Sequence, residues 1–189
     1  MVAVEQVKTY TDAHCRFSGS LVFGGVESGK NGNNAMRELQ LSKLLNLLNL
    51  EVVKYEMPDA ETAILEIQST VAIAICPTCK TPSTRIHDYD EPRLVRDLSL
   101  SGRTSYLRYC SRRFECEVCQ QAFTERVEWM NFNSSYTKRF EEQVYQLCRK
   151  GTVQDVSVFL GLGYDAVEGI FMRYGKKRRR RARKNQSAF

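Results

Sequence analysis

The chain has 189 residues, of which 42% are hydrophobic, and a formal net charge of +6. This length suits one domain or two small ones. It contains no run of about 20 apolar residues, so we expect no membrane-spanning helix, and residues 1–20 lack the apolar core of a secretory signal peptide. We therefore expect a folded cytoplasmic protein, in which seven cysteines indicate metal binding more than disulfides.

The first 75 residues divide into two parts. Residues 1–35 include a stretch rich in Gly, Ser and Asn at 24–34, which predicts a disordered leader. From Met36 the leucines recur at helical spacing, and residues 51–56 and 62–68 have the pattern of strands. The Pro58-Asp59 pair between them is a turn signal, so residues 36–75 predict a helix plus a β-hairpin that leads into the next domain.

Two cysteine knuckles define a candidate metal site. Cys76 and Cys79 form the first C-x-x-C pair, and Cys116 and Cys119 form the second, 36 residues later. Four thiolates in this arrangement can close a tetrahedron around one Zn²⁺, and such a site is structural. His87 is the other candidate ligand, but four sulfurs already complete the shell. Residues 76–130 therefore predict a zinc ribbon.

The residues between the knuckles alternate apolar and charged side chains, as half-buried strands do. Strand-like runs cover 85–89, 93–98, 106–110 and 112–115. A module of about 45 residues buries little apolar surface, so we expect zinc to contribute much of its folding free energy.

Residues 131–175 predict a helix-turn-helix domain of three helices. The first should span 137–150, and Thr152 with Asp155 should cap the second in a capping box. Gly161 marks the turn, and the third helix should span 164–174. Its first turn exposes Tyr164 and Asp165, without an Arg, Asn or Gln that could make a bidentate base contact. A three-helix packing unit that binds no specific DNA site therefore remains an alternative.

The charge is concentrated at the C-terminus. Residues 176–184 contain eight cations, which leaves the rest of the chain about neutral. A run of like charges is typical of a disordered segment, so residues 176–189 predict a basic disordered tail. Such a tail attracts nucleic acid without regard to sequence and in a salt-sensitive way.

From about Leu41 to Tyr174 the chain resembles the N-terminal DNA-binding part of insertion-sequence transposases of the ISL3 family. The resemblance rests on ordered motifs along the chain. These are the Leu-rich segment 44–50, the first knuckle, and the segments 85–89, 95–98, 102–103, 112–116, 137–142 and 152–156. It implies an α+β protein in which a small β-rich zinc ribbon is followed by a helix-turn-helix domain, with disordered termini.

The resemblance also implies a function and a missing part. Family members use these modules to recognise the terminal inverted repeats of their element, and they continue into a catalytic domain with an acidic triad. Only 15 residues follow Tyr174, so we expect a truncated DNA-binding protein without catalytic activity. The expected partners are double-stranded DNA and, among proteins, an intact transposase or a second copy of the chain, with no membrane and no small-molecule substrate. The alternative is a protein-interaction module or inert relic that binds nucleic acid only nonspecifically.

The candidate DNA contacts follow from these modules. In the ribbon they are Arg93, Arg96, Arg103, Arg108, Arg112 and Arg113. In the third helix and the tail they are Tyr164, Asp165, Arg173, Lys176, Lys177, Arg178, Arg179, Arg180 and Arg181.

Overall fold

The computed structural model describes residues 32–186. Helix α1 (Gly32–Leu45) precedes strands β1 (Leu50–Glu56) and β2 (Thr62–Ser69), which pair antiparallel. The expected helix and hairpin are therefore present. Residues 1–31 of the expected leader lie outside the described residues. Helix α1 begins at Gly32, four residues before the expected start at Met36.

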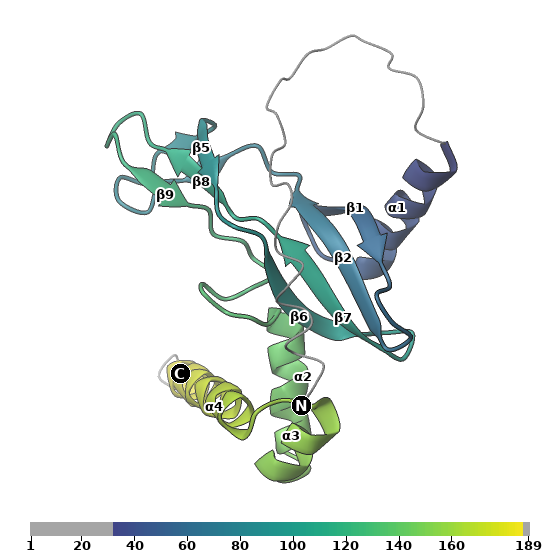
Figure 1. Cartoon of the computed structure of the whole chain (residues 1–189). Helices are drawn as coiled ribbons and strands as arrows, with labels where there is room; N and C mark the ends of the chain where they lie inside the picture. Colours follow the sequence, from purple (N-terminus) through teal and green to yellow (C-terminus); the bar gives the residue numbers. More distant parts are fainter. Residues whose placement is uncertain (1–31, 187–189) are drawn as a thin grey trace.

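A four-stranded sheet forms the centre of the molecule (Figure 1). Strands β6 (Arg93–Leu100) and β7 (Arg103–Tyr109) form its second hairpin. Ser101 and Gly102 connect them with φ of 51° and 80°, the left-handed backbone that a tight two-residue hairpin loop requires. The strand order is β1-β2-β7-β6, with β2 and β7 parallel.

The sheet joins strands from two of the expected domains. Residues 93–98 and 106–110 were expected within the ribbon, and they lie in β6 and β7, which join the N-terminal hairpin through the pairing of β7 with β2. Burial explains this pairing, because Leu65 of β2 and Leu107 of β7 are register partners inside one apolar core. Trp129 closes that core with its ring edge-on to Tyr109, at 5.2 Å between centroids.

The ribbon proper is built from short strands around the two knuckles. Strands β3 (Ala74–Ile75) and β4 (Pro82–Ser83) form a two-stranded sheet. Strands β5 (Ile86–Tyr89), β8 (Arg112–Glu115) and β9 (Ala122–Thr124) form a three-stranded sheet in the order β5-β8-β9. The inserted hairpin β6–β7 therefore separates the knuckles along the chain, while β5 and β8 bring them together.

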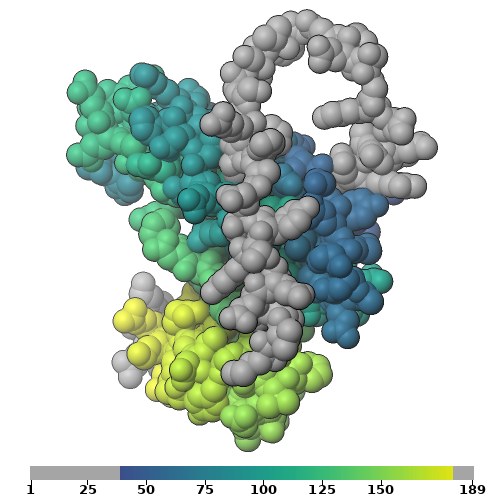
Figure 2. All heavy atoms as spheres, viewed as in Figure 1, coloured from purple at the N-terminus to yellow at the C-terminus, as the bar shows by residue number. Residues whose placement is uncertain are grey.

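Three helices form the other end of the molecule, opposite the ribbon (Figures 1 and 2). They are α2 (Lys138–Cys148), α3 (Val153–Leu160) and α4 (Tyr164–Gln186). A separate apolar core, which includes Phe140, Val144, Val167 and Ile170, holds them together. The described chain is thus α+β, as expected.

Helix α4 is longer than the sequence predicts. We expected it to end at Tyr174 and a disordered tail to begin at residue 176, but α4 runs to Gln186; residues 187–189 lie outside the described part. Lys and Arg are good helix formers, and extending an existing helix needs no new nucleus. Among residues 32–186, no helix has the length and apolar composition needed to cross a membrane.

Candidate metal centre and nucleic-acid interface

The two knuckles place four sulfur atoms together. The Sγ atoms of Cys76, Cys79, Cys116 and Cys119 all lie within 4.8 Å of one another. The turns have matching geometry, because the amide of each first cysteine donates to a carbonyl five residues later, Thr81 at 2.9 Å and Gln121 at 3.0 Å. His87 is not in this cluster.

Left-handed residues close both turns. Lys80 has φ of 63° and donates to the Cys76 carbonyl at 3.1 Å, and Gln120 has φ of 53° and donates to the Cys116 carbonyl at 2.7 Å. Neither residue is a glycine, so each turn adopts a conformation that is unfavourable for its side chain. Two such turns, which together hold the four sulfurs close to one another, support a preformed metal site.

The thiols influence one another's ionisation. The Thr81 hydroxyl lies 3.3 Å from Cys79 Sγ and can donate to its thiolate, which lowers the pKa of Cys79 to about 6. Hydrogen bonding to Cys79 raises the pKa of Cys119 to about 12. Adjacent thiolates repel one another, so a cation placed among the sulfurs would favour the thiolate form that binds metal. Four cysteine sulfurs and no open position fit a structural Zn²⁺.

The helix-turn-helix is defined by its caps. Thr152 and Asp155 form the predicted capping box at the start of α3, with Asp155 N donating to Thr152 Oγ1 at 3.1 Å. Gly161 ends α3 in the left-handed conformation, with φ of 60°. The Ser157 hydroxyl then donates to the Leu162 carbonyl at 2.7 Å, which fixes the approach of α4.

The first turns of α4 expose few groups that could recognise a base. Tyr164 and Asp165 are exposed on its first turn, as expected. Arg173 is 55% exposed, but its guanidinium donates to the fully buried Glu141 carboxylate at 2.8 Å. Its charge is therefore engaged inside the domain.

The remaining cations of α4 lie beyond Tyr174. Arg178 pairs with Glu142 at 2.8 Å and packs on the Tyr145 ring, 5.0 Å from its centroid. Lys177 lies over the Tyr174 ring. Lys176, Arg179 and Arg180 are exposed without an ion-pair partner among the described residues, and Arg181 follows on the same helix.

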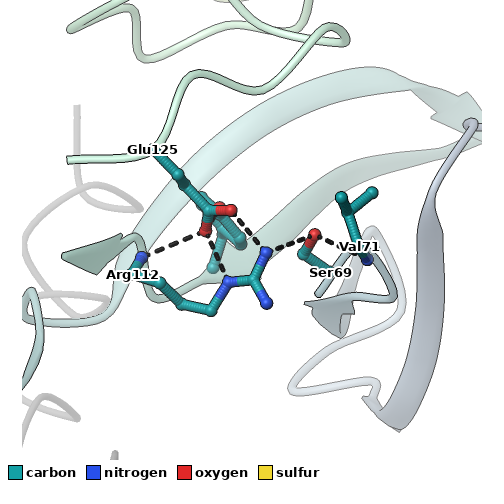
Figure 3. A network of polar contacts seen from close by, with 5 residues as sticks. Ser69, Val71, Arg112 and Glu125 are labelled. Carbon is teal, nitrogen blue, oxygen red and sulfur yellow. Dashed lines mark hydrogen bonds and ion pairs between the residues drawn. The ribbon is translucent and has the colours of Figure 1, made fainter. Parts of the chain in front are cut away.

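Arg112 is held inside the protein. Its guanidinium is 11% exposed and donates to both oxygens of Glu125, through Nε at 3.0 Å and Nη2 at 2.6 Å. Nη2 also donates to Ser69 Oγ at 2.9 Å (Figure 3). This network joins β8 of the ribbon to the end of β2, so the Arg112 guanidinium has a structural role within the fold.

Arg96 is also occupied within the fold. Its Nη2 donates to the Leu160 carbonyl at the end of α3, at 2.7 Å, and its guanidinium lies 5.1 Å from the Phe140 ring centroid. Arg96 N also donates to the Ser135 carbonyl, at 2.9 Å. Arg96 thus holds the helix-turn-helix against β6.

The other four candidate arginines have mixed environments. Arg108 pairs with Glu56 at 3.2 Å, and Arg113 pairs with Asp88 at 3.0 Å. Arg103 is half-buried. Arg93 is half-buried and, among the described residues, donates to Met130 Sδ at 3.6 Å and to no carboxylate.

Sequence reasoning did not identify the three buried carboxylates that bind Arg139, Arg112 and Arg173. Asp97, Glu125 and Glu141 are each buried, and each accepts from an arginine and from other donors. Their positions in the sequence resemble those of ordinary surface acids. Only the fold shows which cation each carboxylate faces.

Two family models match the described segments. One describes the zinc-finger of transposase IS204/IS1001/IS1096/IS1165 and matches residues 74–119. The other describes the helix-turn-helix domain of transposase family ISL3 and matches residues 125–175. Neither the curated proteins nor the solved structures gave a match to the chain.

A zinc ribbon joined to a helix-turn-helix domain defines a DNA-binding protein of the transposase class. The two matched segments, which together cover about half of the residues, are the zinc-ribbon and helix-turn-helix domains of this transposase family.

Proposed function

We propose that the protein binds double-stranded DNA at the terminal inverted repeats of an ISL3-type insertion sequence. The observation that carries this proposal is helix α3, capped at Thr152 and Gly161, and the turn at Gly161 that leads into α4, within a segment that matches the family's helix-turn-helix. In this motif the last helix enters the major groove and presents its first turns to the bases.

We infer that sequence recognition and affinity come from different parts of α4. Tyr164 and Asp165 would face the groove, where neither makes the bidentate contacts that discriminate most strongly. Lys176, Arg179 and Arg180 are exposed on the later turns and would contact phosphates. Phosphate contacts position a protein and add affinity without reading sequence, so we expect moderate specificity and strong salt dependence.

The zinc site would support binding by holding the ribbon in shape. A closed four-thiolate site contributes folding free energy and no open coordination position. Of the candidate ribbon cations, Arg93 has no carboxylate partner among the described residues and would be available for phosphate contact, while Arg96 and Arg112 are engaged inside the protein.

The test is a fluorescence-anisotropy titration of zinc-loaded full-length protein on the repeat duplex and on a scrambled duplex. We expect at least tenfold tighter binding to the repeat, about 1.4 kcal/mol. Replacing Lys176, Arg179 and Arg180 by Gln should weaken binding to both duplexes alike and reduce the salt dependence by about one phosphate per cation.

A control variant replaces Lys43 of α1 and Lys54 of β1 by Gln and should bind as the wild type does. Equal wild-type affinity for both duplexes would overturn the proposal and favour the nonspecific or protein-interaction alternative. Mg²⁺-dependent nicking of the repeat duplex would contradict the expectation that this chain lacks catalytic activity.

A further inference from the structure

An open cavity of about 520 Å³ lies between the sheet and the linker that joins β9 to α2. Arg93 at the start of β6, Tyr109 at the end of β7, and Arg126 and Phe132 of the linker all line it. The linker lies between the ribbon and α4 (Figures 1 and 2). The cavity is therefore at the junction of the two DNA-binding modules.

The two cavity arginines differ from most others in the sheet and ribbon. Arg85, Arg108, Arg112 and Arg113 each form an ion pair. Within the described part of the chain, neither Arg93 nor Arg126 has a carboxylate partner, and Arg126 is exposed. Their charges remain available to an anionic ligand.

An aromatic ring is held at the cavity. Phe132 is 67% exposed on a turn in which Ser134 N donates to the Asn131 carbonyl at 3.1 Å. Asn131 Nδ2 and Ser134 Oγ both donate to the buried Glu141 carboxylate, at 2.6 and 2.9 Å. These hydrogen bonds hold the turn in one conformation, and the turn in turn positions the Phe132 ring at the cavity.

The same carboxylate connects the turn to α4. Glu141 accepts a hydrogen bond from Arg173 of α4 at 2.8 Å. Arg173 immediately precedes the turns of α4 that expose Lys176, Arg179 and Arg180. A DNA backbone held by those turns would therefore pass near the cavity.

We propose that this cavity binds one unpaired nucleotide of a DNA strand, an inference that rests on the proposed DNA-binding function. Base–aromatic stacking combined with cationic backbone contacts is how proteins bind unpaired nucleotides. The base stacks on Phe132, and Arg93 and Arg126 bind the adjacent phosphate. Asp90 and Glu128 also line the cavity, and their carboxylates can accept from the exocyclic amine of a base.

The test compares three labelled duplexes that carry the repeat: one blunt, one with a single unpaired cytosine at the 3′ end, and one with it at the 5′ end. Anisotropy titrations use zinc-loaded full-length protein. We expect about tenfold tighter binding to one of the extended duplexes, equivalent to about 1.4 kcal/mol and within the range for one stacked base.

Variants locate the effect. Phe132→Leu should remove the preference for the extended duplex and leave binding to the blunt repeat unchanged, while Phe132→Trp should retain the preference. Arg93→Gln should reduce it and lower the salt dependence on the extended duplex by about one phosphate. Tyr55→Leu, an exposed aromatic on β1 away from the cavity, is the matched control and should keep it.

Wild-type binding to the blunt and extended duplexes with equal affinity would overturn the inference, as would a full preference in Phe132→Leu. If the protein bound repeat and scrambled duplexes equally but still preferred a duplex with an unpaired nucleotide, the proposed function would be refuted and the cavity site would be supported.

Discussion

Buried carboxylates determine what individual arginines do in this protein. Glu141 is fully buried and accepts hydrogen bonds from Asn131, Ser134 and Arg173. A buried carboxylate is tolerated when its oxygens are bonded in this way, and removing its charge weakens every donor contact at once. Arg173 therefore stabilises the domain, and its charge is less available to DNA than its exposure suggests.

Glu141→Gln should lower the free energy of unfolding by about 2 kcal/mol, because hydrogen bonds to a charged group are worth more than those to an amide. Urea titration measures the change. Glu142→Gln is the control on the next residue of α2, where the ion pair with Arg178 is partly exposed and should contribute under about 1 kcal/mol. An equal loss of unfolding free energy in the two variants would show that burial does not make Glu141 contribute more to stability than Glu142.

Tyr174 makes stability depend on pH in the alkaline range. Burial raises the pKa of Tyr174 to about 12 from the ordinary 10.0, and its hydroxyl donates to the Lys138 carbonyl at 3.0 Å. The unfolded chain loses this proton first, so stability is complete below pH 10.0 and should fall as the pH rises toward about 12. Unfolding titrations across this range should show a shallower fall in Tyr174→Phe, and an unchanged fall would refute this assignment.

Among the secondary-structure elements, α4 differs most from its sequence-based prediction. A helix that ended at Tyr174 would use Gly175 as its cap, whereas in α4 Gly175 lies in the helix interior, and no neighbouring atom lies within 4 Å of the position that a Cβ would take there. Glycine in a helix interior costs about 0.5–1 kcal/mol relative to alanine. A helix that ends at Tyr174 and a helix that continues through Gly175 therefore predict opposite effects of Gly175→Ala on the stability of the domain.

Gly175→Ala should stabilise the domain by about 0.5–1 kcal/mol and raise the helical circular-dichroism signal. Gly161→Ala, at φ of 60° in the turn between α3 and α4, should instead destabilise it by about 1 kcal/mol. A loss of stability in Gly175→Ala would indicate that α4 ends where the sequence pattern suggests.

The linker before α2 behaves as an addition to the sheet. Arg96 and Tyr136 form a parallel bridge, and Thr137 N donates to the Arg96 carbonyl at 3.0 Å. The buried Asp97 carboxylate accepts from Thr137 Oγ1 at 2.7 Å and from the Arg139 guanidinium. The start of the helix-turn-helix domain is thus bonded to β6, which couples the two halves of the protein.

At the scale of the whole molecule, one carboxylate connects the zinc ribbon to the core of the sheet. Glu125 follows β9 of the ribbon, and its carboxylate bonds both Arg112 and the Tyr109 hydroxyl beside Trp129. Unfolding the ribbon would release Glu125 and open this end of the sheet core. The core of α2–α4 is separate and should be affected less.

Cys116→Ser, or zinc removal by a chelator, should therefore shift the emission of Trp129, the single tryptophan, to longer wavelength while most helical signal remains. Zinc content is measured in parallel. Cys148→Ser changes a buried thiol of the helical core and should retain both zinc and the original emission. An unshifted emission in zinc-free Cys116→Ser would show that the sheet is independent of the ribbon.

The parts that could be predicted from sequence are those set by local spacing. The two knuckles, the hairpin of β1 and β2, and the capping box at Thr152 and Asp155 each depend on residues close in the chain. The parallel pairing of β2 with β7 could not be predicted, because it depends on which apolar faces meet across a long separation. The roles of Arg96 and Arg112 were missed for the same reason, since their partners lie far away in the sequence.

The parallel pairing of β2 with β7 also limits how the protein can be divided. A fragment cut at the matched boundaries, residues 74–175, would lose β1 and β2 and leave β7 as an open sheet edge with Leu107 uncovered. Unpaired apolar edges recruit strands from other molecules. Such a fragment would contain both recognisable domains and yet be prone to aggregation, because the N-terminal hairpin covers this edge of the sheet.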